Sequence, residues 1–335
     1  MNSAIIFVQA PADVKYALEF YEKNYKTLKI SICCINVQGM YNFIKSKNLI
    51  VENLYFIPYN FNLSYSNPIT LIKVKVLLYK TYSKLFRGIR DNHIYFFSHF
   101  FDYLSFFMLA RLSKGNNITL INHYDDAIML NYKRPKKSIR ILFICLLYKW
   151  LTNIKFDFFE FSNSIILEFP YKKYGIYQIQ KKQIDYTIID KYKYRINTSC
   201  NNNILFLEND FEKENLHKNY QEVTSKLVQY YLDNDYNIYI KPHPRLGYSF
   251  FLNNYPVKFI NADIPAEFIN EKDFCIIMGI SSTSLTFFAE RKVSKVLSLI
   301  ELYLYQDFKV KEREIKYLED LSKNIYYPKN INDIL

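Results

Sequence analysis

The feature that most constrains the fold of this chain is a repeated alternation of short apolar runs with segments of helical periodicity. The runs predict buried strands, and the segments between them space their apolar residues at intervals of three and four, as helices do. Predicted strands in the first half are residues 4–9, 28–37, 54–58, 93–98 and 117–122. Those in the second half are residues 203–207, 237–241, 257–260, 274–279 and 296–300. Strands that alternate with helices predict α/β folding with parallel, doubly wound sheets.

The alternation is interrupted over residues 171–199, where Lys, Tyr and Asp are frequent and no period is evident. A chain of 335 residues has about the length of two ordinary domains. We therefore predict an N-terminal Rossmann-like domain, residues 1–195, and a C-terminal one, residues 196–335. Two such domains suggest the GT-B architecture, with parallel sheets facing a central cleft that holds the active site.

Composition narrows the class of partner and the compartment. The net charge of +12 implies an anionic partner, such as a nucleotide, an acidic glycan, a membrane surface or a nucleic acid. The five cysteines lack C-x-x-C spacing and lie mostly in apolar runs, which favours a reducing cytoplasm. Residues 4–8 predict a first strand and not a signal peptide, and the longest apolar run, 141–151, is shorter than the roughly 20 residues that span a bilayer. We expect a cytoplasmic protein.

A histidine between two prolines ends one predicted strand, in the sequence Asn-Ile-Tyr-Ile-Lys-Pro-His-Pro-Arg at residues 237–245. Proline cannot donate to a sheet ladder, so the strand must end there and His243 lies at its carboxyl edge. Ligands of open α/β sheets bind at that edge, and Lys241 and Arg245 add positive charge beside it. His243 either satisfies local backbone groups in a turn or donates a hydrogen bond or proton to a leaving phosphate.

A run of hydroxyl residues follows another predicted strand and opens a helix. It consists of Ser281, Ser282, Thr283 and Ser284, preceded by Gly279 and Ile280, and the helix is predicted over residues 281–291. Backbone N–H groups and hydroxyls converge there, where a helix N-terminus favours negative charge. Helix capping is the alternative interpretation, although one hydroxyl would suffice for it. Because the run lies at the same sheet edge as the histidine, both groups could reach one phosphate.

Three carboxylates are further candidates. Asp125 and Asp126 follow a strand of the first half and could remove a proton from an acceptor hydroxyl, or simply occupy a helix N-terminal turn. Glu267 opens a short helix over residues 265–270 and could accept hydrogen bonds from ribose hydroxyls, or simply favour the first helical turn. The Asp-Asn-Asp at residues 233–235 imitates a metal motif but lies in a predicted turn, so we assign no metal.

Taken in order, these motifs resemble those of a known group of enzymes. Asp125-Asp126-Ala127, His243-Pro244 and Ser281-Ser282-Thr283-Ser284 look like the acidic, HP and serine-rich motifs of bacterial sialyltransferases. The resemblance is closest to glycosyltransferase family 52, the lipooligosaccharide sialyltransferases, and Pro265-Ala266-Glu267 adds to it. Ala127 stands where the family has glycine, which would strain that turn if it needs a positive φ.

The resemblance implies a metal-independent, inverting transfer of sialic acid, or a related nonulosonic acid, from a CMP-activated donor. It implies an acceptor with a terminal galactose-type hydroxyl on a bacterial surface glycan, lipooligosaccharide or capsule, and no cofactor. One aspartate of the Asp125/Asp126 pair would deprotonate that hydroxyl, and His243 would assist departure of the CMP phosphate. Ser281 and Ser282 would hold the phosphate.

Two alternatives stay open. The nearest is a hexosyltransferase of the same fold that uses another nucleotide sugar. A non-catalytic basic protein that binds acidic polysaccharide or nucleic acid is less favoured, because the basic residues are scattered along the helices and not clustered with aromatics. The predicted helices near residues 71–86 and 138–153 could contact the inner face of the cytoplasmic membrane or, for the second, form a homodimer; core-facing helices are the alternative.

Overall fold

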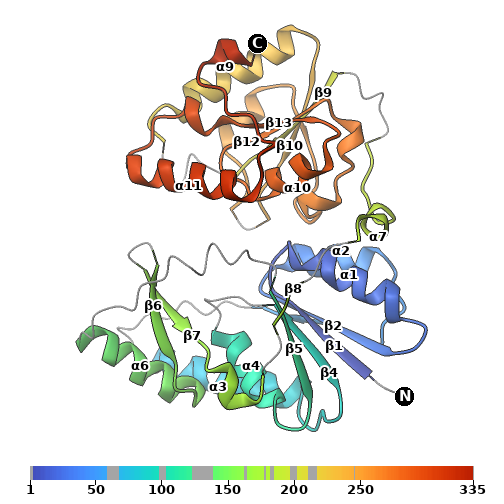
Figure 1. The fold of residues 1–335 in the computed structure, drawn as a ribbon, viewed down its shortest axis with the longest axis vertical. Coiled ribbons are helices and arrows are strands. Elements are labelled where there is room, and N and C mark those ends of the chain that lie inside the picture. Colours follow the sequence, from blue (N-terminus) through green and yellow to red (C-terminus); the bar gives the residue numbers. More distant parts are fainter. Residues whose placement is uncertain are drawn as a thin grey trace. The chain divides into compact units, whose positions relative to one another are not determined.

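The computed structural model describes residues 3–58, 68–97, 103–122, 139–161, 164–176, 179–181, 185–196, 202–209, 217–244 and 246–334. Two units, Met1–Asp185 and Tyr186–Leu335, each contain a parallel sheet with helices on both faces (Figure 1). The predicted fold class is confirmed: the chain has two Rossmann-like α/β domains, as GT-B proteins do.

In the described part of the first unit, six parallel strands have the order β3-β2-β1-β4-β5-β8, the strand order of the doubly wound Rossmann sheet. Their bounds are β1 Ser3–Val8, β2 Lys29–Ile35, β3 Asn53–Ile57, β4 His93–Phe97, β5 Asn117–Asn122 and β8 Ile179–Lys181. β8 pairs with β5 inside the stretch that the sequence predicted as a connection. It escaped prediction because a three-residue edge strand has no period of its own.

The helices of the first unit cover both faces of its sheet. α1 and α2 lie on one face, and α3 and α4 on the other (Figure 1). Their bounds are α1 Asp13–Asn24, α2 Gln38–Ser46, α3 Pro68–Leu85, α4 Tyr103–Leu112 and α6 Ile139–Thr152. Ile5 and Phe7 point to the face of α3 and α4 and share a core with Val74 and Phe107. Residues 156–169, to which the sequence assigned no element, include an antiparallel hairpin, β6 Asp157–Phe161 with β7 Ser164–Glu168.

In the described part of the second unit, five parallel strands have the order β11-β10-β9-β12-β13. The strands are β9 Asn203–Leu207, β10 Asn237–Lys241, β11 Lys258–Phe259, β12 Ile276–Gly279 and β13 Lys295–Ser298; the helices are α7 Tyr186–Asp190, α9 Tyr220–Asp233, α10 Ser284–Arg291 and α11 Phe308–Leu321. Side chains alternate along β9: Ile204 and Phe206 pack with α9, whereas Leu205 and Leu207 pack with α10. The central strand is therefore buried on both faces.

The segment of residues 186–196 packs with the second unit, although the sequence placed the domain boundary after Arg195. Arg291 of α10 forms ion pairs with Asp190 and with the buried Glu271. Lys193 contributes a second cation to Glu271, and Tyr194 N donates to Phe268 O at 2.6 Å. These contacts join residues far apart in sequence, so no local pattern could place the boundary before Tyr186.

Among the helices that the structure describes, none combines the length and the apolar character needed to cross a membrane.

Candidate functional site

The carboxyl edge of the second sheet gathers most of the predicted site residues. The chain runs from β9 outward to β10 and β11, and then returns to β12 on the other side of β9. Ligands of open α/β sheets bind outside the strand ends at such a reversal. His243 follows β10 and Ser281 follows β12, so the end of β9 lies between them and the two strands are about 10 Å apart.

His243 lies in a closed turn that fixes its ring. The backbones of His243 and Gly247 exchange two hydrogen bonds of 2.9 Å, and Gly247 has a φ of +84°, which glycine adopts without strain. Leu246 N donates to Nδ1 of the imidazole at 3.1 Å. Because Nδ1 is an acceptor, the neutral ring carries its proton on Nε2, and Nε2 is a hydrogen-bond donor. Pro244 lies in this turn and is partly buried.

Lys241 lies at the end of β10 with only 4% of its surface exposed. Its Nζ donates to Pro242 O at 2.6 Å and to Ala262 O at 3.2 Å. Burial lowers the pKa of Lys241 from 10.5 to about 8, and the carboxylates of Glu267 and Asp263 oppose that shift in part. The ammonium thus ties β10 to the loop after β11.

Glu267 is buried next to this lysine, at 6% exposed. The helix expected over residues 265–270 is a three-residue 3-10 turn, Ala266–Phe268, because the backbone of Ile269 returns to an extended conformation. Among the described residues the carboxylate of Glu267 accepts no hydrogen bond, and its interaction with Lys241 is electrostatic.

The hydroxyl run divides into residues with different surroundings. α10 begins at Ser284, three residues later than the sequence predicted, and Ser282 Oγ accepts from Ser284 N at 3.3 Å. The N-cap residue is Thr283, and its side chain makes no capping hydrogen bond. Within the described chain the hydroxyls of Ser281, Thr283 and Ser284 form no hydrogen bond and are at least partly exposed.

Gly279 ends β12 inside the sheet and is buried. A Cβ at this position would lie 3.2 Å from both the Cβ and the carbonyl oxygen of Leu207 on β9. The missing side chain thus allows β12 to approach β9 closely, at the point where the chain leaves the sheet for the hydroxyl run.

Glu208, which the sequence analysis missed, organises this edge from the end of β9. It is 2% exposed, and its Oε1 accepts from Tyr220 Oη at 2.5 Å and from Ser249 Oγ at 2.7 Å. Its Oε2 accepts from Ser249 N at 3.1 Å. Since Ser249 follows the turn of His243, Glu208 anchors that turn to the central strand. A single acid after a predicted strand was the only signal available in the sequence.

In the first unit, the backbone N–H groups after β1 donate to a carboxylate of the same chain. Asp13 is fully buried, and its Oδ2 accepts from Gln9 N and Ala10 N at 2.8 Å each. In nucleotide-binding Rossmann sheets the N–H groups after the first strand hold a phosphate. A carboxylate satisfies them here, which favours the second unit as the anion-binding one.

Asp125, Asp126 and Arg245 lie outside the described residues. β5 ends at Asn122, three residues before Asp125, at the carboxyl edge of the first sheet.

Two Rossmann-like units, with polar donors at the strand reversal of the second, give the fold class of GT-B proteins. Residues 42–299 match the family model of the alpha-2,8-polysialyltransferases (POLYST), and the chain belongs to that family. The predictions of a sialyltransferase and of a glycosyltransferase enzyme are confirmed at this level. The closer resemblance to family 52 stays an interpretation.

Solved structures with a similar fold share little sequence identity with this chain. UDP-GlcNAc 2-epimerase from Methanocaldococcus jannaschii is 13% identical with a TM-score of 0.45, over 95% of this chain and 92% of that one. The E. coli heptosyltransferase WaaC with ADP is 11% identical with a TM-score of 0.40, over 98% and 94%. The calicheamicin glycosyltransferase CalG4 is 7% identical with a TM-score of 0.49, over 98% and 86%. No curated protein matches the sequence.

Proposed function

We propose that this protein transfers sialic acid from a CMP-activated donor to a glycan hydroxyl with inversion, and that the second unit holds the donor. The family match supports sialyl transfer. The observation that carries the role of the second unit is the fixed ring of His243, whose Nδ1 accepts the Leu246 N–H and whose Nε2 is a donor at the carboxyl edge of the sheet.

In the proposed reaction the acceptor oxygen forms a bond to the anomeric carbon while the bond from that carbon to the CMP phosphate oxygen breaks. The electron pair of the broken bond goes to the phosphate, and the acceptor proton goes to Asp125 or Asp126. Nε2–H of His243 and the hydroxyls of Ser281 and Ser282 would donate to the phosphate as its charge grows. Such donors act most strongly when they are preorganised, as the Leu246 contact makes the imidazole.

The remaining donor contacts extend the same proposal. Glu267 would accept from the ribose, while Thr283, Ser284 and Arg245 would add donors around the phosphate. Gly279 and Pro244 would shape the backbone, and Lys241 would hold the strand ends in place and keep the local field positive. No metal enters the proposed reaction, so transfer should persist in the presence of a chelator.

The acceptor and the setting are part of the proposal. The family name refers to an alpha-2,8 linkage, which suggests a terminal sialic acid as acceptor, whereas the sequence motifs suggested a terminal galactose-type residue on lipooligosaccharide or capsule. Both acceptors should be offered, each with CMP-sialic acid. We expect a cytoplasmic enzyme that forms such a surface glycan in a bacterium.

The direct test measures acceptor-dependent release of CMP and gain of one sialic acid by the acceptor. His243→Asn should keep the turn, since the asparagine oxygen can accept the Leu246 N–H. It should lower kcat about 100-fold, because the shorter side chain has no N–H at the position of Nε2. His93→Asn, at an exposed histidine of β4, is the matched control and should leave kcat unchanged. Release of UDP from UDP-hexoses in place of CMP would favour the hexosyltransferase alternative. If His243→Asn transferred sialic acid as fast as the wild type, the proposed role of His243 as a donor to the phosphate would be wrong.

A further inference from the structure

α6 of the first unit consists largely of apolar residues, yet most of them on one side of the helix are exposed. Leu151 is fully buried. The exposed side carries Ile139 (89%), Leu142 (59%), Phe143 (59%), Leu146 (56%) and Trp150 (45%). These residues recur at intervals of three and four and form one stripe along the helix. An exposed apolar stripe of this extent marks an interaction site.

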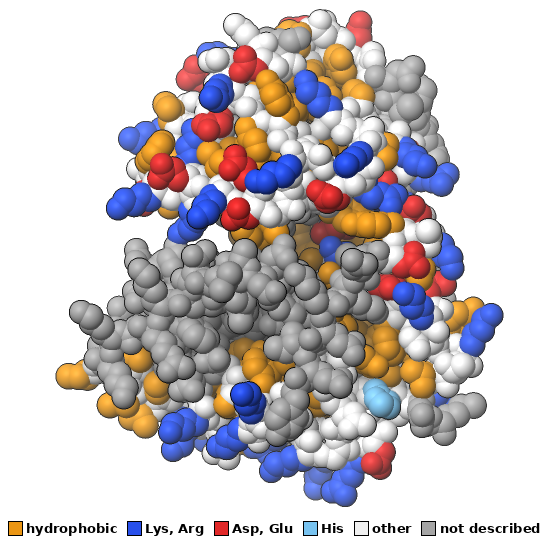
Figure 2. All heavy atoms as spheres, in the orientation of Figure 1, with side chains coloured by type: hydrophobic (Ala, Val, Ile, Leu, Met, Phe, Trp, Pro, Cys, Tyr) orange, Lys and Arg blue, Asp and Glu red, His pale blue; other side chains and the backbone are white. Residues whose placement is uncertain are grey.

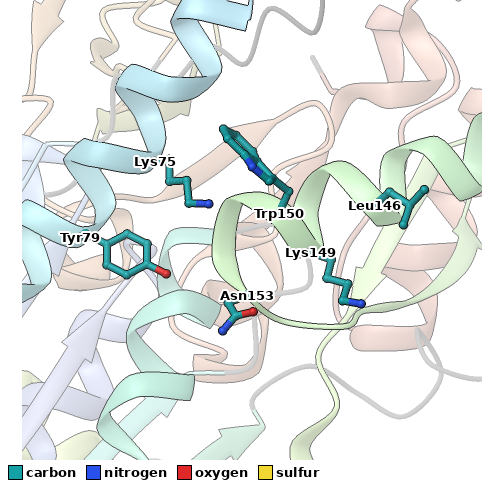
Figure 3. Close-up of a pocket in the computed structure, with 6 residues that line it drawn as sticks. All are labelled: Lys75, Tyr79, Leu146, Lys149, Trp150 and Asn153. Carbon is teal, nitrogen blue, oxygen red and sulfur yellow. The ribbon is translucent and has the colours of Figure 1, made fainter.

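α3, which lies beside α6, exposes an apolar row of its own. Ile69, Ile72 and Val76 are 64%, 54% and 60% exposed, again at intervals of three and four. A hollow of about 340 Å³ lies between the helices (Figure 3). It is lined by Lys75 and Tyr79 from α3 and by Leu146, Lys149, Trp150 and Asn153 from α6 and the residue after it. Lys75 Nζ lies 4.2 Å from the centroid of the Trp150 ring.

The charges of these two helices have one sign. Their basic residues are Lys73, Lys75, Lys80, Lys84, Arg140 and Lys149, and neither helix contains Asp or Glu. Hydrophobic and basic side chains gather along the edge of the first unit where these helices lie (Figure 2). A second copy would place the same basic face against itself, which like charges oppose. An anionic surface with an apolar interior satisfies both the charges and the stripe.

We propose that this α3–α6 face docks on an anionic lipid bilayer. The exposed side chains of α6 and α3 enter the boundary between headgroups and acyl chains, with the helices in the plane of the membrane. The lysines extend their ammonium groups to the lipid phosphates while their methylene stems stay among the apolar side chains. The hollow between Lys75, Lys149 and Trp150 accommodates one headgroup phosphate. A tryptophan at the headgroup level is typical of proteins at a membrane interface.

The position of Trp150 provides a direct measurement, because it is the single tryptophan of the chain. Vesicles of phosphatidylglycerol should shift its emission to shorter wavelength, and brominated acyl chains should quench it. Vesicles of phosphatidylcholine alone should do so much less, and added salt should weaken the binding because it screens the lysines. An emission spectrum that phosphatidylglycerol leaves unchanged would overturn the proposal.

Substitutions distinguish binding through the α3–α6 face from nonspecific binding of the protein to vesicles. The double variant Phe143→Ser with Leu146→Ser should reduce vesicle cosedimentation about tenfold or more, because two inserted side chains are lost. Phe308→Ser on α11, 66% exposed in the second unit, is the matched control and should bind like the wild type. Far-ultraviolet circular dichroism checks that both variants fold. Equal binding by the double variant, or a dimer in sedimentation that this variant dissociates, would assign the face to another partner and refute bilayer docking.

Discussion

At the residue scale, buried polar side chains decide the shape of the proposed donor site. Glu208 joins the end of β9 to Tyr220 and Ser249, and Lys241 joins β10 to the loop after β11. Each side chain satisfies backbone or hydroxyl groups that would otherwise be buried without a partner. The turn of His243 lies between Lys241 and Ser249, the partner of Glu208, in the sequence, so its position depends on both anchors.

Removal of the Glu208 carboxylate should unfold the protein more easily. Glu208→Ala leaves the hydroxyls of Tyr220 and Ser249 buried without their acceptor, and we expect a loss of about 3 kcal/mol in the free energy of unfolding. Denaturation in urea measures it. Glu222→Ala, on the exposed side of α9, is the control and should change stability little. An equally small effect at Glu208 would show that water replaces its hydrogen bonds.

Lys241 should make stability depend on pH in the alkaline range. Its pKa is about 8 in the folded protein against 10.5 ordinarily, so between these values the unfolded chain binds more protons. Stability therefore rises with pH in this window, and the gain is lost as pH falls through 8. Relative to Lys241→Met, the wild type should gain about 3 kcal/mol between pH 7 and pH 10.5. Parallel curves for the two proteins would show that the lysine titrates normally.

At the element scale, the site depends on how closely the strands of the second sheet approach one another. β12 pairs with β9 through Gly279 and Leu207, and the hydroxyl run starts two residues later at Ser281. A shift of β12 would therefore move Ser281 and Ser282 relative to the end of β9. The loop can place its hydroxyls only as accurately as the strand before it is placed.

Gly279→Ala tests this dependence. The added Cβ meets the backbone oxygen of Leu207 at 3.2 Å, so β12 must move, and we expect a loss of about 1–3 kcal/mol in the free energy of unfolding. Thr283→Ala, at an exposed position of the loop, should have little effect on stability. Calorimetric melting compares the two variants. If Gly279→Ala were as stable as the wild type, the sheet would accommodate the added methyl group without a loss of free energy of unfolding.

At the scale of the whole molecule, the chain consists of two units whose boundary lies before Tyr186. The segment of residues 186–196 brings Lys193 to the buried Glu271, beside Arg291. Glu271 is 1% exposed, so its charge depends on both cations, and they hold the pKa of its carboxyl below the usual range although burial raises it.

Two fragments should differ in stability for this reason. Residues 186–335 should fold as a unit, whereas residues 197–335 lose Lys193 and should be less stable by about 3 kcal/mol, because a buried carboxylate loses one of its partners. Thermal unfolding of both fragments measures the difference. Equal midpoints would return the boundary to the position that the sequence predicted, after Arg195.

The sequence by itself determined the α/β class, nearly all strands of both sheets and the place of His243 at a strand end. Strands and helices are local, since period and proline chemistry act over a few residues, and β5 has the predicted bounds of residues 117–122. The tertiary structure decided what depends on distant partners. Glu208 finds Tyr220 12 residues away and Ser249 41 residues away, and Lys193 finds Glu271 78 residues away. Burial and hydrogen bonding between such residues arise only when the sheet has formed, so no local sequence pattern could predict them.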